Sequence, residues 1–120
     1  MNLEKAKGEY NFQEDIFVAR SLRRDYDSSF QIGNLIFDLD SKNKVIGLEI
    51  VNASKLFGIP KLVLKNMVSG KIIVIASNKI IRTEITLESS LRNSQKTSSL
   101  SVERIKPEFI NATELHLAVA

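Results

Sequence analysis

The chain carries few of the side chains that perform catalytic chemistry. It has no cysteine and one histidine, His116. Without cysteine there are no disulfide bonds, no thiolate metal sites and no cysteine nucleophile. His116 lies between Leu115 and Leu117 in an alternating segment, and a catalytic role would need an acid or nucleophile partner that the sequence does not place. We therefore expect His116 to be a half-exposed strand residue.

Four aspartates form the one carboxylate cluster that suggests a metal site. Asp38 and Asp40 lie two residues apart near a strand end, so both are expected on one face. Together with Asp25 or Asp27 they could supply oxygen ligands to Mg²⁺ or Ca²⁺. The spacing lacks the central glycine and final glutamate of a calcium-binding hand. The favoured interpretation is that these aspartates cap turns of their own backbone.

Glu49 is the other carboxylate of interest. It shares a strand face with Gly47 and two valines. A carboxylate in such a setting reaches solvent at a sheet edge or pairs with a cation, here Arg20 or Arg82. A general base usually works with a second group, and none is placed beside Glu49 by the sequence.

The basic residues are more frequent in the second half of the chain. Residues 1–60 hold eight Lys and Arg against nine Asp and Glu, whereas residues 61–120 hold nine against five. The two groupings are Arg20, Arg23 and Arg24, and then Lys61, Lys65, Lys71 and Lys79. Lys61 and Lys65 are one helical turn apart, so they form a basic edge that could contact phosphate. With few aromatic side chains to stack bases, a solvated surface is favoured.

Alternation of apolar and polar residues predicts most of the structural elements. The expected strands are 15–22, 31–39, 45–51, 71–76, 79–87, 102–105 and 114–119, with a hairpin turn at 40–44. A short broken helical segment is expected at 53–68, capped by Asn52 and interrupted at Gly58, and a helical turn at 107–111. Residues 88–101 hold six serines and only two leucines, which predicts a flexible loop.

These elements predict a single domain spanning residues 1–120. The composition, 43% hydrophobic and 26% charged, is that of a soluble globular protein. No apolar run approaches the roughly 18 residues of a membrane span, and the first residues lack a signal peptide core, so a cytoplasmic location is expected. The expected fold class is α+β, with six or seven mainly antiparallel strands and a helical segment after the third.

Three segments carry a resemblance to a known family. They are Tyr10-Asn11 with Asp15–Val18, then Gly33–Asp40, then Ile46–Ser54 with its Gly-x-Glu-Ile-x-x-Ala-Ser pattern. Over residues 10–57 the chain resembles the prokaryotic domain of unknown function 2283 family. The resemblance implies a three-stranded antiparallel meander followed by a helix. It implies no activity, and some members look like partners of small toxin-like proteins.

The first hypothesis is a non-catalytic interaction module that binds another protein or itself, with no cofactor and no membrane. Several strands are apolar on both sides, which leaves surface for association. Leu115, Leu117 and Val119 in the last strand are expected to lie uncovered and to promote a homo-oligomer. The alternatives are a nucleic-acid-binding or regulatory module that uses the basic second half, and a small metal-dependent hydrolase. In the family-like segment, Leu48 and Ile50 are expected to enter the core.

Overall fold

The computed structural model of the chain describes residues 3–120. Within this range the chain forms nine strands and two short helices: β1 Glu4–Asn11, β2 Ile16–Ser21, β3 Ser28–Ile32, β4 Leu35–Leu39, β5 Val45–Val51, α1 Ala53–Phe57, α2 Lys61–Lys65, β6 Met67–Ala76, β7 Ile80–Leu91, β8 Ser94–Ile105 and β9 Thr113–Val119. The mainly antiparallel α+β class is confirmed. Neither helix has the length and apolar character that crossing a membrane requires.

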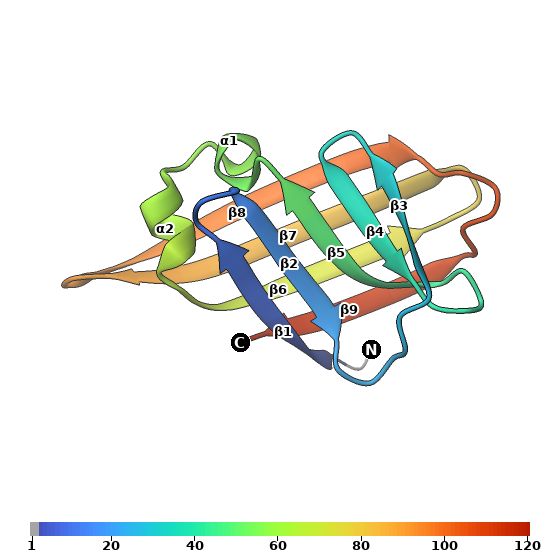
Figure 1. Cartoon of the computed structure of the whole chain (residues 1–120), viewed down its shortest axis with the longest axis horizontal. Coiled ribbons are helices and arrows are strands. Elements are labelled where there is room, and N and C mark those ends of the chain that lie inside the picture. The colour runs from blue at the N-terminus through green and yellow to red at the C-terminus, as the bar shows by residue number, and fades with distance from the viewer. Residues whose placement is uncertain (1–2) are drawn as a thin grey trace.

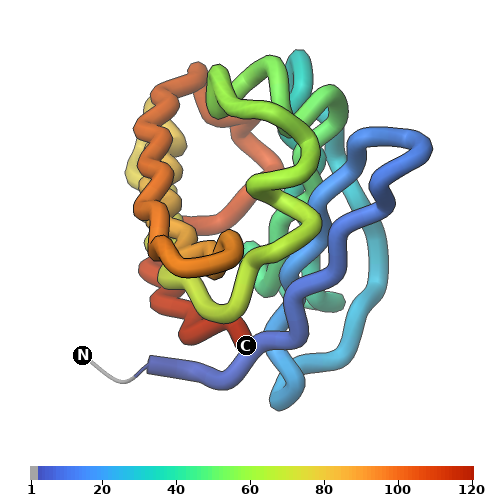
Figure 2. The backbone as a smooth tube through the Cα atoms, turned by 90° about the vertical axis from the view of Figure 1, so that its left-hand side faces the viewer, coloured from blue at the N-terminus to red at the C-terminus, as the bar shows by residue number. Residues whose placement is uncertain are grey.

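The strands form one sheet that folds over itself into two layers. Its order is β3-β4-β5-β2-β1-β9-β6-β7-β8, and every neighbouring pair is antiparallel except β1 and β9, which are parallel. The first layer, β3 to β1 in this order, crosses in front of the second, β9 to β8 (Figure 1). Figure 2 views the layers from the side, with the helical segment bridging them at one end.

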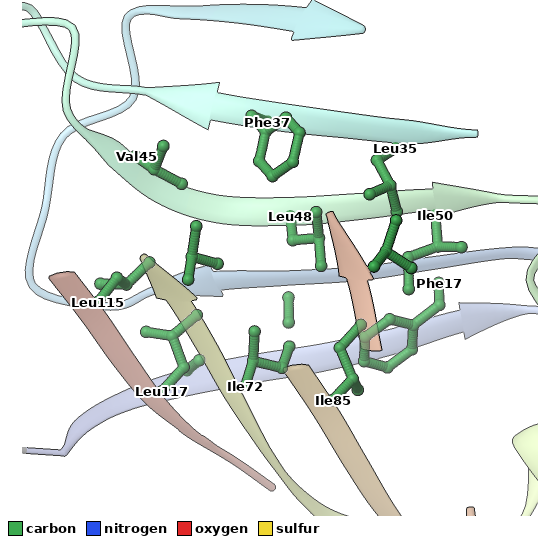
Figure 3. Close-up of a cluster of buried hydrophobic side chains, with 14 of the residues drawn as sticks. Phe17, Leu35, Phe37, Val45, Leu48, Ile50, Ile72, Ile85, Leu115 and Leu117 are labelled. Carbon is green, nitrogen blue, oxygen red and sulfur yellow. The ribbon is translucent and has the colours of Figure 1, made fainter. Parts of the chain in front are cut away.

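The core lies between the layers and draws on both of them. Alternate side chains of β2, β4 and β5 face alternate side chains of β6, β7 and β9 across it (Figure 3). The largest fully buried members are Phe17, Phe37, Leu35, Leu39, Ile46, Leu48, Ile50, Leu64, Ile72, Ile81, Ile85 and Leu87. The expectation that Leu48 and Ile50 enter the core is confirmed.

The last strand is covered, contrary to expectation. Leu115, Leu117 and Val119 are at most 2% exposed because they point into the core. Position explains the error: β9 is last in the chain but lies in the middle of the sheet, between β1 and β6. Being last in the sequence does not place a strand at a sheet edge, so this face offers no surface for self-association.

The prediction of six or seven strands was too low, and β1 and β3 account for two missing strands. The inward positions of β1 include Ala6 and Gly8, which are too small to give an apolar alternation. The five residues of β3 hold two apolar side chains, Phe30 and Ile32, and follow a polar stretch that reads as loop. Pairing with neighbouring strands, rather than hydrophobicity, determines both elements.

Residues 88–101, expected as a flexible loop, form two paired strand segments joined by a turn at residues 92–93. β7 continues to Leu91 and β8 begins at Ser94, and the two pair throughout this stretch. Inward-facing positions there are held by Ser89 and Ser98, which are 1% and 6% exposed. Serine at buried strand positions hides the alternation on which the prediction relied.

The expected helical segment is two helices, α1 and α2, and its last residues belong to β6. Gly58 ends α1 with a φ of 69°, as predicted. The predicted cap is wrong, because Asn52 is left-handed at φ 55° and makes no side-chain hydrogen bond to the helix. Asp15, in the β1–β2 turn, accepts hydrogen bonds from the Ser54 backbone N–H at 2.9 Å and from Ser54 Oγ at 2.7 Å.

Asp15 also accepts a 2.6 Å hydrogen bond from the Tyr10 hydroxyl, so one carboxylate joins β1, its turn and α1. Burial raises the pKa of Asp15, but the hydrogen bonds from Ser54 and Tyr10 outweigh burial and hold the pKa below its ordinary value. The same contact and burial raise the pKa of Tyr10. The carboxylate is therefore ionised at neutral pH and stabilises the fold in that form.

We expect Asp15→Asn to lower the free energy of unfolding by about 1–3 kcal/mol, because the amide cannot satisfy all three donors. Urea unfolding at pH 7 measures the loss. The carboxylate contribution disappears as pH falls through the lowered pKa of Asp15, so the two proteins converge in strong acid. The control, Asn52→Gly, should stay within about 0.5 kcal/mol, since glycine readily adopts the left-handed conformation. A larger loss at Asn52 than at Asp15 would mean that Asn52 caps the helix.

Candidate functional site

A row of polar side chains crosses the outer side of the first layer. The register places Ser29, Asp38, Gly47 and Arg20 side by side on β3, β4, β5 and β2. Asp38 is fully buried. Its Oδ2 accepts hydrogen bonds from Arg20 Nε at 3.2 Å and Nη2 at 3.1 Å, and its Oδ1 accepts one from Ser29 Oγ at 2.8 Å. A mid-strand aspartate is thus fully paired rather than free to bind a ligand.

Gly47 makes this pairing possible. It lies between Arg20 and Asp38, and a Cβ there would lie 2.8 Å from the Ala19 carbonyl oxygen and 2.9 Å from Arg20 Cα. No side chain fits without moving β2. The empty position lets the Arg20 guanidinium extend across β5 to a carboxylate two strands away.

Tyr26 covers the guanidinium from the solvent side. Arg20 Cζ lies 4.2 Å from the centre of the Tyr26 ring, and the Tyr26 hydroxyl lies 2.6 Å from Ser29 Oγ. The ring face attracts the cation while the hydroxyl closes the hydrogen-bonded chain. Arg20 is therefore held in one orientation from two sides.

Glu49 occupies the neighbouring row in an apolar setting. Its cross-strand partners are Ile36 on β4 and Val18 on β2. Burial, with a hydrogen bond to Asp38 and repulsion by its charge, raises the pKa of Glu49 to about 7, although Arg20 opposes the rise. Of the two cations expected for it, Arg20 is bound by Asp38, and Arg82 lies in the other layer with its Nη2 at 2.8 Å from Glu103.

Around Glu49 the surface is apolar and uncovered. We call the side of the first layer that points away from the core the outer face. Ile16, Val18, Ile36 and Val51 are all half-buried there, and Ile16 and Val51 are direct partners. Within residues 3–120 no strand or helix lies over it, as Figure 1 shows by viewing this side directly. β2 is apolar on both sides, with Phe17 and Ala19 in the core and Ile16 and Val18 on the outer face.

Two shallow hollows lie end to end along β1 and β2 on the outer face. One, of about 380 Å³, is lined by Glu9, Asn11, Glu14, Ile16 and Val18 together with Tyr10. The other, of about 240 Å³, is lined by Lys7, Glu9, Val18, Arg20, Ser21 and Leu22. They share Glu9 and Val18, and beyond these two residues one hollow contains Glu14 and the other contains Lys7 and Arg20.

The structure places the four aspartates in different surroundings. Asp25 and Asp27 lie in the exposed connection before β3, and Asp38 is paired with Arg20. Asp40 lies outside β4, where its Oδ1 accepts hydrogen bonds from the Lys42 and Lys44 N–H groups at 2.9 and 3.1 Å. Turn capping, the favoured interpretation, is correct for Asp40. Across residues 3–120, no three His, Cys, Asp or Glu side chains gather where they could hold a metal ion.

The remaining predicted residues are dispersed over the fold. His116 is half-buried, with Nε2 at 3.1 Å from Glu114 Oε1. Arg24 binds both oxygens of the buried Glu4 at 2.9 Å. Lys61 and Lys65 lie on α2, with their Nζ atoms 5.6 and 5.1 Å from the centre of the Phe12 ring. Arg23 follows β2, Lys71 lies on β6 and Lys79 in the β6–β7 turn.

Comparison with known proteins places these features in a family. The sequence model of a family described as "Protein of unknown function (DUF2283)" matches residues 7–54. An uncharacterized protein of Methanocaldococcus jannaschii is 31% identical over 88 residues, which is 72% of each chain. The chain belongs to the DUF2283 family. No solved structure matches it.

The DUF2283 segment contains the whole polar row. It also contains Glu49, Asp15 and Ser54, so the beginning and end of the segment meet at the start of α1. The meander that the resemblance implied is wrong in its order, because β5 lies between β2 and β4. The Gly-x-Glu spacing was the one sequence signal for the site: its glycine makes room for Arg20, and its glutamate stands in the apolar row.

Glu49 gives the stability of the protein a distinct pH dependence. Its folded pKa of about 7 exceeds the ordinary 4.5, so its favourable contribution is full below pH 4.5 and is lost as pH rises through 7. The wild type should therefore lose about 1–2 kcal/mol relative to Glu49→Gln between pH 5 and pH 8, after allowance for solvent contact. Urea unfolding across that range measures it. Glu103→Gln, on the other layer, is the control, and parallel curves for the wild type and Glu49→Gln would contradict the prediction.

Proposed function

We propose that this protein is a non-catalytic interaction module that docks a protein surface on its outer face. The observation that carries the proposal is the cluster of half-buried Ile16, Val18, Ile36 and Val51 on the outer face. No strand or helix lies over this face within residues 3–120 (Figure 1). Contiguous apolar surface rimmed by polar groups marks interaction sites in proteins of this size. Here the rim consists of the Arg20–Asp38 pair on one side and Glu9 with Asn11 on the other.

The chemistry of the face supports binding rather than catalysis. Both oxygens of Asp38 are engaged, so its carboxylate is not available as a base. Glu49 can exchange a proton near neutral pH, but the groups around it are Asp38, Arg20 and aliphatic side chains, which provide no nucleophile. The hollows beside it are shallow and open, whereas small-molecule sites enclose most of their ligand.

Nucleic-acid binding is a second candidate, favoured by the surroundings of Phe12. Its ring is 43% exposed, and Lys61 and Lys65 approach it from α2. An exposed ring can stack on a base while lysines contact phosphates. A binding constant for single-stranded DNA that falls steeply with salt, and is weakened by Phe12→Ala, would support this candidate.

Site-specific photo-crosslinking tests the docking function. A benzophenone amino acid at Ile36 should crosslink to a protein in the native host, because Ile36 lies in the uncovered row. The same amino acid at Thr86, on the outer side of β7, should give no matching adduct. Mass spectrometry then identifies the adduct. Absence of any adduct at Ile36, or equal adducts at both positions, would contradict docking at the outer face.

A further inference from the structure

We propose that the junction of β1 and β9 binds a small amphiphilic carboxylate, that is, an apolar chain or ring that ends in a carboxylate group. The site lies where the two layers join, apart from the apolar cluster of Ile16, Val18, Ile36 and Val51 (Figure 1). The inference therefore goes beyond the proposed docking function. Two observations carry it: an apolar hollow at this junction and lysines on both sides of the hollow.

The hollow at the junction is larger and more apolar than the two on the outer face. Its volume is about 460 Å³, against about 380 and 240 Å³ for the others. Leu22, which is 67% exposed, is part of its lining. Five of the seven lining residues are apolar: Ala6, Leu22, Ala118, Val119 and Ala120. A hollow of this size lies in the range of small-molecule sites, whereas one apolar side chain of a partner protein would leave much of it unfilled.

Lysines lie on both sides of Ala118 in the hollow. The register pairs Ala118 with Lys5 on β1 and with Lys71 on β6. Neighbouring strands are about 4.8 Å apart, a distance that a lysine side chain spans, so both ammonium groups can reach a group bound over Ala118. Both lysines are exposed, and within residues 3–120 neither forms an ion pair with a carboxylate. A third lysine, Lys7, lines the hollow but is paired with Glu9 at 3.0 Å.

These surroundings select the chemistry of the ligand. A carboxylate can accept charge-assisted hydrogen bonds from Lys5 and Lys71, while the attached apolar part displaces water from Leu22 and the alanines. An apolar cation would be repelled by the same two lysines. A small inorganic anion would leave the apolar lining in water. Only a molecule that combines an apolar body with a negative group matches both features of the hollow.

Isothermal titration calorimetry of the full chain with decanoate, kept below the concentration at which it forms micelles, tests the inference. Decanoate should bind in the submillimolar range. Decyltrimethylammonium, which has the same chain length and the opposite charge, should bind at least about tenfold more weakly, because attraction is replaced by repulsion. Decanoate binding should also weaken as sodium chloride is added, since salt screens exposed lysines.

Four variants locate the binding. Lys5→Gln and Lys71→Gln should each raise the dissociation constant of decanoate by about two- to fivefold, the range of one exposed ion pair. Ala118→Phe should abolish binding, because the ring fills the hollow. Lys79→Gln removes the same charge in the β6–β7 turn, away from the hollow, and is the matched control that should leave the dissociation constant unchanged.

Three results would overturn the inference: no binding of decanoate, equal binding of the two decyl compounds, or an equal loss in Lys79→Gln and the other lysine variants. Undiminished binding by a folded Ala118→Phe protein would do the same. Circular dichroism verifies that each variant is folded. If Ala118→Phe does not fold, the comparison of Lys5→Gln and Lys71→Gln with Lys79→Gln decides.

Discussion

The parallel pairing of β1 with β9 is the contact on which the architecture depends. Three residue pairs, Glu4 with Leu117, Lys5 with Ala118 and Ala6 with Val119, join the two layers into one sheet. These pairs bring together strands more than 100 residues apart in the sequence. Closing so long a loop costs conformational entropy, and contacts within a single hairpin cannot offset that cost. Gly8 assists this junction, because a Cβ at that position would collide with Val119. The core between the layers repays the cost of closure.

A second constraint, the absence of a side chain at Gly47, determines how the polar residues of the outer face are arranged. Gly47 allows Arg20 to reach Asp38. Because the guanidinium and the carboxylate bind each other, neither is free to bind a ligand. The row then serves as a fixed polar border for the apolar residues beside it. Removing the Arg20 charge alone would leave the fully buried Asp38 carboxylate uncompensated, which costs more than an exposed pair would contribute. Glu49 stands just inside this border, where burial and the neighbouring Asp38 carboxylate raise its pKa.

Sequence periodicity was sufficient for the strands that bury branched or aromatic residues, such as β5 with Leu48 and Ile50. It failed where the buried positions are small or hydroxylated: Gly8 in β1, and Ser89 and Ser98 in the β7–β8 hairpin. The residues of the candidate site likewise divide into those that the sequence pattern indicated and those that it did not. Glu49 was recognisable as a carboxylate in an apolar strand, whereas the Arg20–Asp38 pair depends on β5 being inserted between β2 and β4. That order is set by long-range pairing, which has no local signature.

The outward-facing sides of the two layers differ in how polar side chains flank their apolar residues, and the fold alone does not require this difference. On β6, Ile73 lies between His116 and Glu84, and Ile75 between Glu114 and Arg82, so long polar side chains flank each isoleucine. On the first layer, Val18 is flanked in the same way by Glu9 and Glu49, but Ile16 and Val51 are direct neighbours with no such side chain between them. Both sides surround the same core and face the same solvent, so stability gives no reason for the difference. A partner surface at the first layer does, because two β-branched side chains in direct contact, such as Ile16 and Val51, can be covered together by one apolar surface.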